Sequence, residues 1–323
     1  MSANRTITKT GRIGMPLAVV PAVLALLAAA PAAQGQVRGA PVSSASVAVG
    51  PQYDTAHVYV SPGTSTAFVR SWLATFGGTS TTPVVTQVTP TPSRAVSQLV
   101  LSPVGTLSVF DYRTTIPYPF GQERGSDMVS SFSRGVDAAV HSGAYLVVSP
   151  FRDPIGKDAI VQFPGGVDTQ LYWHTKPTSY PKLATIPENR VYLEPSAANA
   201  FIRDYLAFSR GRIIADDRHA DGAQLGRPGT TFRAVLISSA FGKTLVIVTD
   251  GHLPYPFGRE TTGYAVSNLA ATLAKAKAAG ARVLWGPYNS AAIDTAIVQF
   301  PGGYIAEIHQ PGHQARTAPL AGH

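Results

Sequence analysis

The sequence contains no cysteine, and only 14% of its 323 residues are charged. Without cysteine the chain can form no disulfide, no thiolate metal site and no iron–sulfur cluster, and it has no cysteine nucleophile. Any metal site must therefore use histidine, carboxylate, amide or water ligands. Charged residues usually make up about 25% of a soluble domain, so the low share predicts an unusually uncharged surface.

Basic residues outnumber acidic residues by 26 to 18, which gives a formal net charge of +8. Three of the positive charges, Arg5, Lys9 and Arg12, lie near the N-terminus, and no later segment combines a basic run with interleaved aromatic residues. We therefore expect no nucleic acid partner. Hydrophobic residues make up 45% of the chain, enough for a buried core, while 30 glycines and 26 prolines indicate many turns and argue against a helical bundle.

The N-terminal segment has the three zones of a secretory signal peptide. An uncharged apolar run at 15–30 follows the early positive charges, and a string of small residues allows cleavage after Ala32. The run is interrupted by two prolines and is shorter than the roughly 20 residues of a membrane-spanning helix. We predict a signal peptide at 1–32, a lead-in segment at 33–50, and a periplasmic or secreted bacterial protein with no stable membrane anchor after cleavage.

Two sequence motifs occur twice. The segment AIVQFPGG at 159–166 recurs letter for letter at 296–303, and PYPFG at 117–121 recurs at 254–258. The two pairs have the same offset along the chain. This offset is far longer than the roughly 20–50 residues of solenoid repeats, so it predicts two domain-sized copies.

A third pair sets the beginning of each copy. The segment HVYV at 57–60 is echoed by RVYL at 190–193. The offset of this pair is slightly shorter than that of the other two, so one copy carries four extra residues between these blocks. A proline-containing connector lies between the copies. The predicted parts are domain 1 at 51–175, a linker at 176–185, domain 2 at 186–310 and a tail at 311–323.

Strand and helix patterns alternate within each copy. Residues 66–76 place apolar side chains at helical spacing before two glycines, and residues 269–279 form a second helix ended by Gly280. Short β-rich runs surround these helices. The predicted strands are 56–60, 97–102, 106–112, 232–238, 244–249, 264–266, 282–285, 295–300 and 304–309. Each copy is therefore expected to be an α+β domain made of two βαβββ modules.

This order of elements resembles the vicinal oxygen chelate superfamily, which comprises glyoxalases, bleomycin-resistance proteins and extradiol dioxygenases. The segment FPGGYIAEI at 300–308 is similar to the closing hairpin of that superfamily. His57 and Val58 look like its opening strand, and residues 67–77 look like its first helix. The resemblance implies two tandem glyoxalase-like domains, each a pair of βαβββ modules that form a cupped mixed sheet with the helices outside.

In that superfamily a divalent ion lies where the opening, middle and closing strands converge. The resemblance assigns the opening positions to His57 and Arg190, the middle positions to Arg124 and Thr261 with Glu123 and Glu260 beside them, and the closing positions to Gln170 and Glu307. A guanidinium does not bind a cation, so only His57 and Glu307, with Glu260 as a third ligand, form a competent set. The resemblance thus implies one site shared by the two copies.

Each of these residues also allows a simpler interpretation. Glu307 lies in an otherwise apolar strand, so it either binds a metal or forms an ion pair with Arg190. His57 is either a ligand or a structural histidine at a strand edge. The PYPFG loops either place Tyr118 and Tyr255 on a ligand or form rigid turns.

Two main functions follow from these alternatives. The first is metal-assisted lyase or isomerase chemistry of the glyoxalase type, in which a divalent ion polarises a small substrate and Glu307 or Glu260 moves a proton. The second is metal-free binding or sequestration of a small molecule, as in bleomycin-resistance proteins. In either case Arg190, Gln170, Tyr118 and Tyr255 are the expected ligand contacts. A structural or interaction protein without a ligand is a third alternative.

Overall fold

The computed structural model describes residues 49–312, except residues 51, 54–55, 89–92, 114–121, 128–131, 153–155, 177 and 179. The predicted signal peptide lies outside the described residues, as do most of the lead-in segment and most of the tail. No helix among the described residues is both long and apolar enough to span a membrane.

The first part of the chain forms a nine-stranded mixed sheet with two helices. Its strands follow the order β2-β4-β5-β1-β6-β9-β8-β7, and β3 pairs with β4 outside this path. The elements are β1 (Ala56–Val60), α1 (Ser65–Phe76), β2 (Thr79–Ser80), β3 (Val84–Val88), β4 (Ser93–Ser102), β5 (Gly105–Tyr112), β6 (Gln122–Asp127), α2 (Phe132–His141), β7 (Tyr145–Arg152), β8 (Gly156–Phe163) and β9 (Val167–His174).

The second part forms an eight-stranded mixed sheet of the order β11-β12-β13-β10-β14-β17-β16-β15. The elements are β10 (Glu188–Leu193), α3 (Pro195–Ser209), β11 (Arg212–Asp221), the short 3-10 helix η1 (Gly222–Leu225), β12 (Thr231–Ser239), β13 (Gly242–Val248), β14 (Thr261–Ala265), α4 (Leu269–Ala278), β15 (Arg282–Asn289), β16 (Ile293–Gln299) and β17 (Ile305–Pro311).

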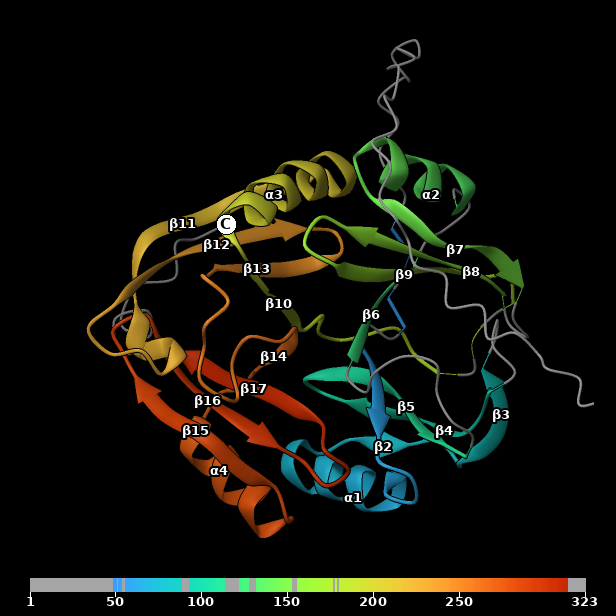
Figure 1. Ribbon diagram of the computed structural model, residues 1–323. Helices are drawn as coiled ribbons and strands as arrows, with labels where there is room; N and C mark the ends of the chain where they lie inside the picture. The colour runs from blue at the N-terminus through green and yellow to red at the C-terminus, as the bar shows by residue number, and fades with distance from the viewer. Residues whose placement is uncertain are drawn as a thin grey trace, which may run out of the picture. The chain divides into compact units, whose positions relative to one another are not determined.

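The two sheets have equivalent central strands. The opening strand, β1 or β10, runs parallel to one neighbour (β5 or β13) and antiparallel to the other (β6 or β14). The middle strand, β6 or β14, in turn runs parallel to the closing strand, β9 or β17. Figure 1 shows that each sheet curls, with its helices outside. The predicted fold class is therefore confirmed: two α+β domains, each built from two βαβββ modules.

The two large hydrophobic cores are each shared by the two sheets. One core joins α2, β8 and β9 to α3 and the strands β10, β12 and β13. The other joins α1, β1, β4 and β5 to α4 and the strands β14 to β17. In this second core the Trp72 ring lies 4.8 Å from the Tyr264 ring and 5.0 Å from the Phe300 ring. Accordingly, α1 lies beside α4 and α2 beside α3 (Figure 1).

The repeated FPGG turns dock reciprocally onto the opposite sheet. Gly302 lies against Val60 and Thr64, so that an added Cβ would be 2.9 Å from the Val60 Cβ. At the equivalent turn, an added Cβ on Gly165 would overlap the Leu193 side chain. Both glycines have φ +86°. The exact repetition of this motif therefore has a packing reason, because a side chain at either glycine would separate the two sheets.

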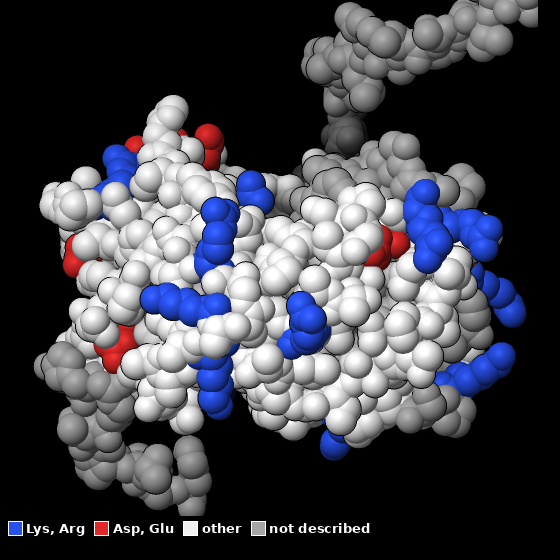
Figure 2. Space-filling model, turned by 90° about the horizontal axis from the view of Figure 1, so that it is seen from below, with Lys and Arg blue, Asp and Glu red and all other residues white. Residues whose placement is uncertain are grey.

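Figure 2 shows the face seen from below. Most of this face is formed by uncharged residues, and basic side chains are more frequent on it than acidic ones. This agrees with the low share of charged residues and with the net charge of +8.

Candidate functional site

The candidate site lies on the inner face of the second sheet, which is the face turned away from the shared cores. Val191 and Leu193 of β10 belong to one core. Because side chains alternate along a strand, Arg190 points to the inner face. In β17 the same rule applies: Ala306 and Ile308 are core residues, so Glu307 and His309 point inward.

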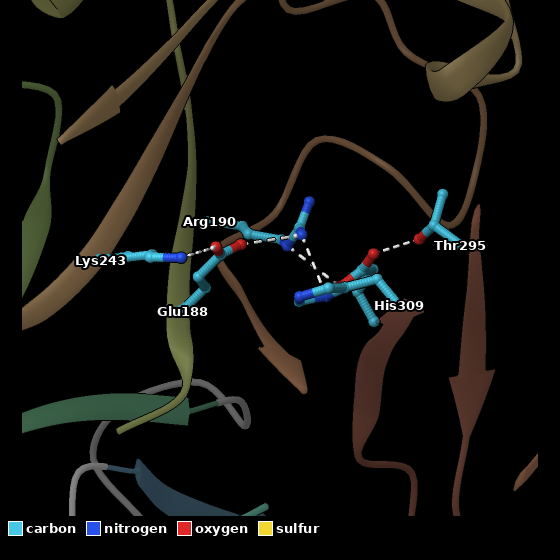
Figure 3. A network of polar contacts seen from close by, with 6 residues as sticks. Glu188, Arg190, Lys243, Thr295 and His309 are labelled. Atoms are coloured by element: carbon cyan, nitrogen blue, oxygen red, sulfur yellow. Dashed lines mark hydrogen bonds and ion pairs between the residues drawn. The ribbon is translucent and has the colours of Figure 1, made fainter. Parts of the chain in front are cut away.

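Arg190 is the centre of a buried polar network (Figure 3). Its Nε lies 3.1 Å from Glu307 Oε2, and its Nη2 donates a 3.0 Å hydrogen bond to Glu188 Oε2. The same Nη2 lies 3.2 Å from His309 Nδ1, which is itself 2.7 Å from Glu307 Oε2. Arg190 and Glu307 are only 7% and 4% exposed. One guanidinium thus joins polar groups from two strands that are not neighbours.

Three further residues support this network. The Thr295 hydroxyl donates to Glu307 Oε1, and Lys243 Nζ lies 4.0 Å from Glu188 Oε1. Gly263 of β14 lies between the two strands, and a Cβ there would collide with Arg190 Nε and come within 2.8 Å of Glu307 Oε2. Glycine at this position therefore leaves the space through which Arg190 reaches Glu307.

The network holds both central groups in their charged forms. Burial alone would raise the pKa of Glu307, but Arg190 and His309 outweigh it, so that this pKa is lowered. Burial likewise acts to lower the pKa of Arg190, and Glu307 and Glu188 outweigh it, so that this pKa is raised. Burial raises the pKa of the neighbouring Tyr192 to about 12, so its phenol stays neutral.

These residues do not fit a divalent cation. Among the described residues, no three histidine or carboxylate side chains lie close enough together to hold one metal ion. The position between Glu307 and His309 is taken by the guanidinium of Arg190, which donates hydrogen bonds and repels cations. The sequence left two alternatives for Glu307, a metal ligand or an ion pair with Arg190. The structure contains the ion pair.

The structure does not place His57 among the contacts of Glu307, as a metal site shared by the two copies would require. The contacts of Glu307 are Arg190, Thr295 and His309, all in the second sheet. His57 lies in the first sheet, with its ring 5.5 Å from the Phe110 ring. The neighbours of His57 in β1, such as Val58, belong to the core that both sheets share. His57 and Glu307 therefore lie on opposite sides of this core: His57 points away from it on the first sheet, and Glu307 points away from it on the second sheet.

The other predicted contacts are also dispersed. Gln170 lies in β9 of the first sheet, and so does not accompany Arg190. Glu260 precedes β14 by one residue and is not among the contacts of Glu307. Tyr255 is 63% exposed. Tyr118 lies outside the described residues, as do the side chains of Glu123 and Arg124.

Aromatic side chains lie on the same inner face, at its edge. Trp285 and Tyr288 of β15 pair with Ile297 and Thr295 of β16, which face inward. The Trp285 ring stacks on Tyr288 at 5.8 Å and meets Phe257 of the second PYPFG loop edge-on at 5.1 Å. The loop thus contributes its phenylalanine to this wall, whereas its tyrosine points to solvent.

Sequence reasoning missed Glu188, His309 and Thr295. The pattern Glu307-x-His309 carried a usable signal, because residues two apart in a strand share a face. Glu188 and Arg190 have the same spacing in β10. Thr295 could be found only from the register, in which it pairs with His309.

A separate cavity of about 220 Å³ lies at the rim of the second sheet. Its lining includes Arg227, Asp250 and Leu253. Arg227 Nη1 donates hydrogen bonds of 2.9 and 3.0 Å to the two carboxylate oxygens of Asp250. None of the residues of the Arg190 network lines this cavity.

No protein-family model matches the sequence, and no curated protein matches it. Solved structures with the same fold do match. A triple mutant of 4-hydroxymandelate synthase from Streptomyces coelicolor aligns with a TM-score of 0.55 and 14% identity, over 84% of this chain and 98% of that chain. A xylose isomerase-like TIM barrel/4-hydroxyphenylpyruvate dioxygenase fusion protein aligns with a TM-score of 0.51 and 12% identity, over 87% of this chain and 51% of that chain.

Proposed function

We propose that this chain, whose fold is that of the vicinal oxygen chelate superfamily, is a metal-free protein that binds a small aromatic molecule on the inner face of its second sheet. The observation that carries the proposal is the buried ion pair between Arg190 and Glu307. It engages the carboxylate on which metal-assisted lyase or isomerase chemistry would depend, and it leaves Glu307 ionised without a metal.

The ligand class follows from the side chains on this face. Phe257, Trp285 and Tyr288 supply an aromatic wall at the edge of the sheet. Figure 3 shows one terminal nitrogen of Arg190 without a dashed line, directed away from Glu188 and His309. This nitrogen is a donor for a carbonyl or carboxylate oxygen. A planar ring that carries such an oxygen satisfies both features.

Metal content and ligand binding test this proposal together. Metal analysis is done on the protein as isolated and after incubation with divalent ions followed by dialysis, and we expect no stoichiometric metal. Binding of benzoate, phenylacetate and 2-naphthoate is followed by tryptophan fluorescence, with the corresponding alcohols as neutral analogues. We expect the acids to bind more tightly, and R190K and W285A to weaken binding by roughly tenfold or more.

The matched control is W173F, because Trp173 lies in β9 of the first sheet. It should leave the affinities unchanged. Binding that depends on Arg227 or Asp250 instead of Arg190 would place the ligand in the rim cavity and contradict the proposal, and so would a stoichiometric metal in the wild-type protein.

We also propose that the protein is exported to the periplasm or the medium. The charged, apolar and small-residue zones of the segment 1–32 support this. The test is mass spectrometry of the protein recovered from its native host. Cleavage after Ala32 is expected, whereas a cytoplasmic protein that retains Met1 would refute export.

A further inference from the structure

A small cavity lies between the two sheets, inside the core that joins α2 to α3, here called the α2–α3 core. Its volume is about 20 Å³. A single water molecule needs roughly 10–15 Å³, so the cavity has room for one water and for nothing larger. All of its lining residues are buried: Val167 and Thr169 of β9, Asn189 of β10, Phe201 and Tyr205 of α3, Phe241, and Thr244 of β13.

Polar side chains from both sheets meet at this cavity. Thr169 belongs to the first sheet, and Asn189 pairs with Thr244 in the second. Asn189 is only 6% exposed, and its Oδ1 accepts no hydrogen bond from any residue that the structure describes. A buried oxygen without a partner loses its hydration and gains nothing in return. The cavity beside Asn189 is therefore the place from which a hydrogen bond to this oxygen must come.

The other shared core, here called the α1–α4 core, is apolar at the same positions. By strand register and by the repeat, Ala56 is equivalent to Asn189, Leu107 to Thr244 and Ala306 to Thr169. All three of these residues belong to the α1–α4 core, and the larger ring of Trp72 occupies the helix position of Tyr205. The polar residues thus replace apolar ones together, at three positions that line one cavity.

We infer that this cavity binds one structural water molecule, which bridges the two sheets through Asn189 Oδ1 and the hydroxyls of Thr169 and Thr244. A buried water typically makes about three hydrogen bonds to protein groups. It donates to the amide oxygen, and each hydroxyl donates or accepts as the geometry requires. The junction of the sheets is then hydrated in the α2–α3 core and dry in the α1–α4 core.

This inference is independent of the proposed function. Asn189 alternates with Arg190 along β10, so the cavity lies on the core face of the strand and the Arg190 network on the inner face. Failure of the aromatic ligand to bind therefore leaves the water site untouched, and failure of the water site leaves the ligand proposal untouched.

The experiment compares the wild-type full chain with the triple variant T169A/N189A/T244L, which carries the residues of the α1–α4 core at these positions. In crystal structures that show ordered water, we expect a peak at hydrogen-bonding distance from Asn189 Oδ1 and from at least one of the two threonine hydroxyls in wild type. In solution, magnetic relaxation dispersion of water oxygen counts the long-lived internal waters. The triple variant should have one fewer.

The matched control is Y264F, which removes a buried hydroxyl from the α1–α4 core. Its count of internal waters should equal that of wild type. An ordered wild-type map without a peak in the cavity overturns the inference, and so does an equal count of internal waters in wild type and the triple variant.

T169V/T244V provides a second measurement should the triple variant fail to fold. Valine has the shape of threonine without the hydroxyl, so the double variant deprives the water of two partners and leaves the packing nearly unchanged. We expect its melting temperature to fall by a few degrees. An unchanged or raised melting temperature would mean that the two hydroxyls have no water to bind, and would overturn the inference.

Discussion

The Tyr288 hydroxyl donates a 2.7 Å hydrogen bond to Asp221 Oδ2. Tyr288 lies in β15 and Asp221 ends β11, and these strands are the two edges of the second sheet. A contact between opposite edges means that the sheet curls until its ends meet. This hydrogen bond therefore closes the rim around the inner face on which Arg190 and Glu307 lie.

Removing this contact should loosen the rim without unfolding the sheet. In Y288F the ring still stacks on Trp285, but Asp221 loses its hydrogen bond from β15. We expect faster amide hydrogen exchange in β11 and unchanged exchange in β10 and β14, as measured by mass spectrometry of peptic peptides. S290A, which removes a hydroxyl that bonds only to the backbone of Ile293 at the start of β16, is the control. Equal exchange in β11 for Y288F and wild type would mean that other contacts close the rim.

Loss of the buried cation should be strongly destabilising. R190A leaves Glu307 and Glu188 without their guanidinium partner. Breaking a buried ion pair by removing one partner typically costs about 3–5 kcal/mol, and we expect a loss of this size in the free energy of unfolding in urea. R282A removes an arginine that is exposed on β15, and should stay within about 0.5 kcal/mol of wild type. A similar loss for the two variants would show that the buried pair at Arg190 contributes no more to stability than an exposed arginine does.

The lowered pKa of Glu307 predicts acid sensitivity. Because the folded-state pKa lies below that of the unfolded chain, the unfolded state binds more protons as the pH falls. The stabilisation is fully present above the unfolded value of about 4.3 and is lost as the pH drops through the folded value. E307Q should be less stable at pH 7 and should show a shallower decline in acid, as measured by urea unfolding at a series of pH values. Parallel curves for wild type and E307Q would contradict this role of Glu307.

The repeated motifs made the fold predictable from the sequence, because positions related by their common offset had to be equivalent. Predicted and observed boundaries agree within a few residues in β5, α1 and α4. The strand β11 was missed because its sequence RIIADDRHAD is mostly exposed and shows no alternation of apolar and polar residues. Hydrophobic periodicity arises when one face of a strand is buried. Because β11 is an edge strand with almost no buried face, its sequence lacks this periodicity.

The site was predictable only in part. The sequence repeat showed that His57 is equivalent to Arg190 and that Gln170 is equivalent to Glu307. A repeat does not show which faces of the two sheets pack against each other. The sheets share their core faces, as the contact of Gly302 with Val60 illustrates. Residues on the inner face of one sheet are therefore kept apart from those on the inner face of the other. Glu307 accordingly pairs with Arg190 of its own copy and not with His57.

The paired glycines of the FPGG turn allow the docking of the two sheets to be measured. Gly165 and Gly166 both have positive φ, +86° and +82°, so alanine is strained at either position. Only Gly165 faces the opposite sheet: a Cβ there overlaps Leu193, whereas nothing lies within 4 Å of a Cβ on Gly166. The free energy of unfolding in urea should therefore fall by about 1–3 kcal/mol more in G165A than in G166A. Both variants carry the backbone strain, so the difference between them measures overpacking against the opposite sheet. Equal losses would mean that the turn yields without disturbing the junction, and that the repetition of this motif reflects its backbone conformation alone.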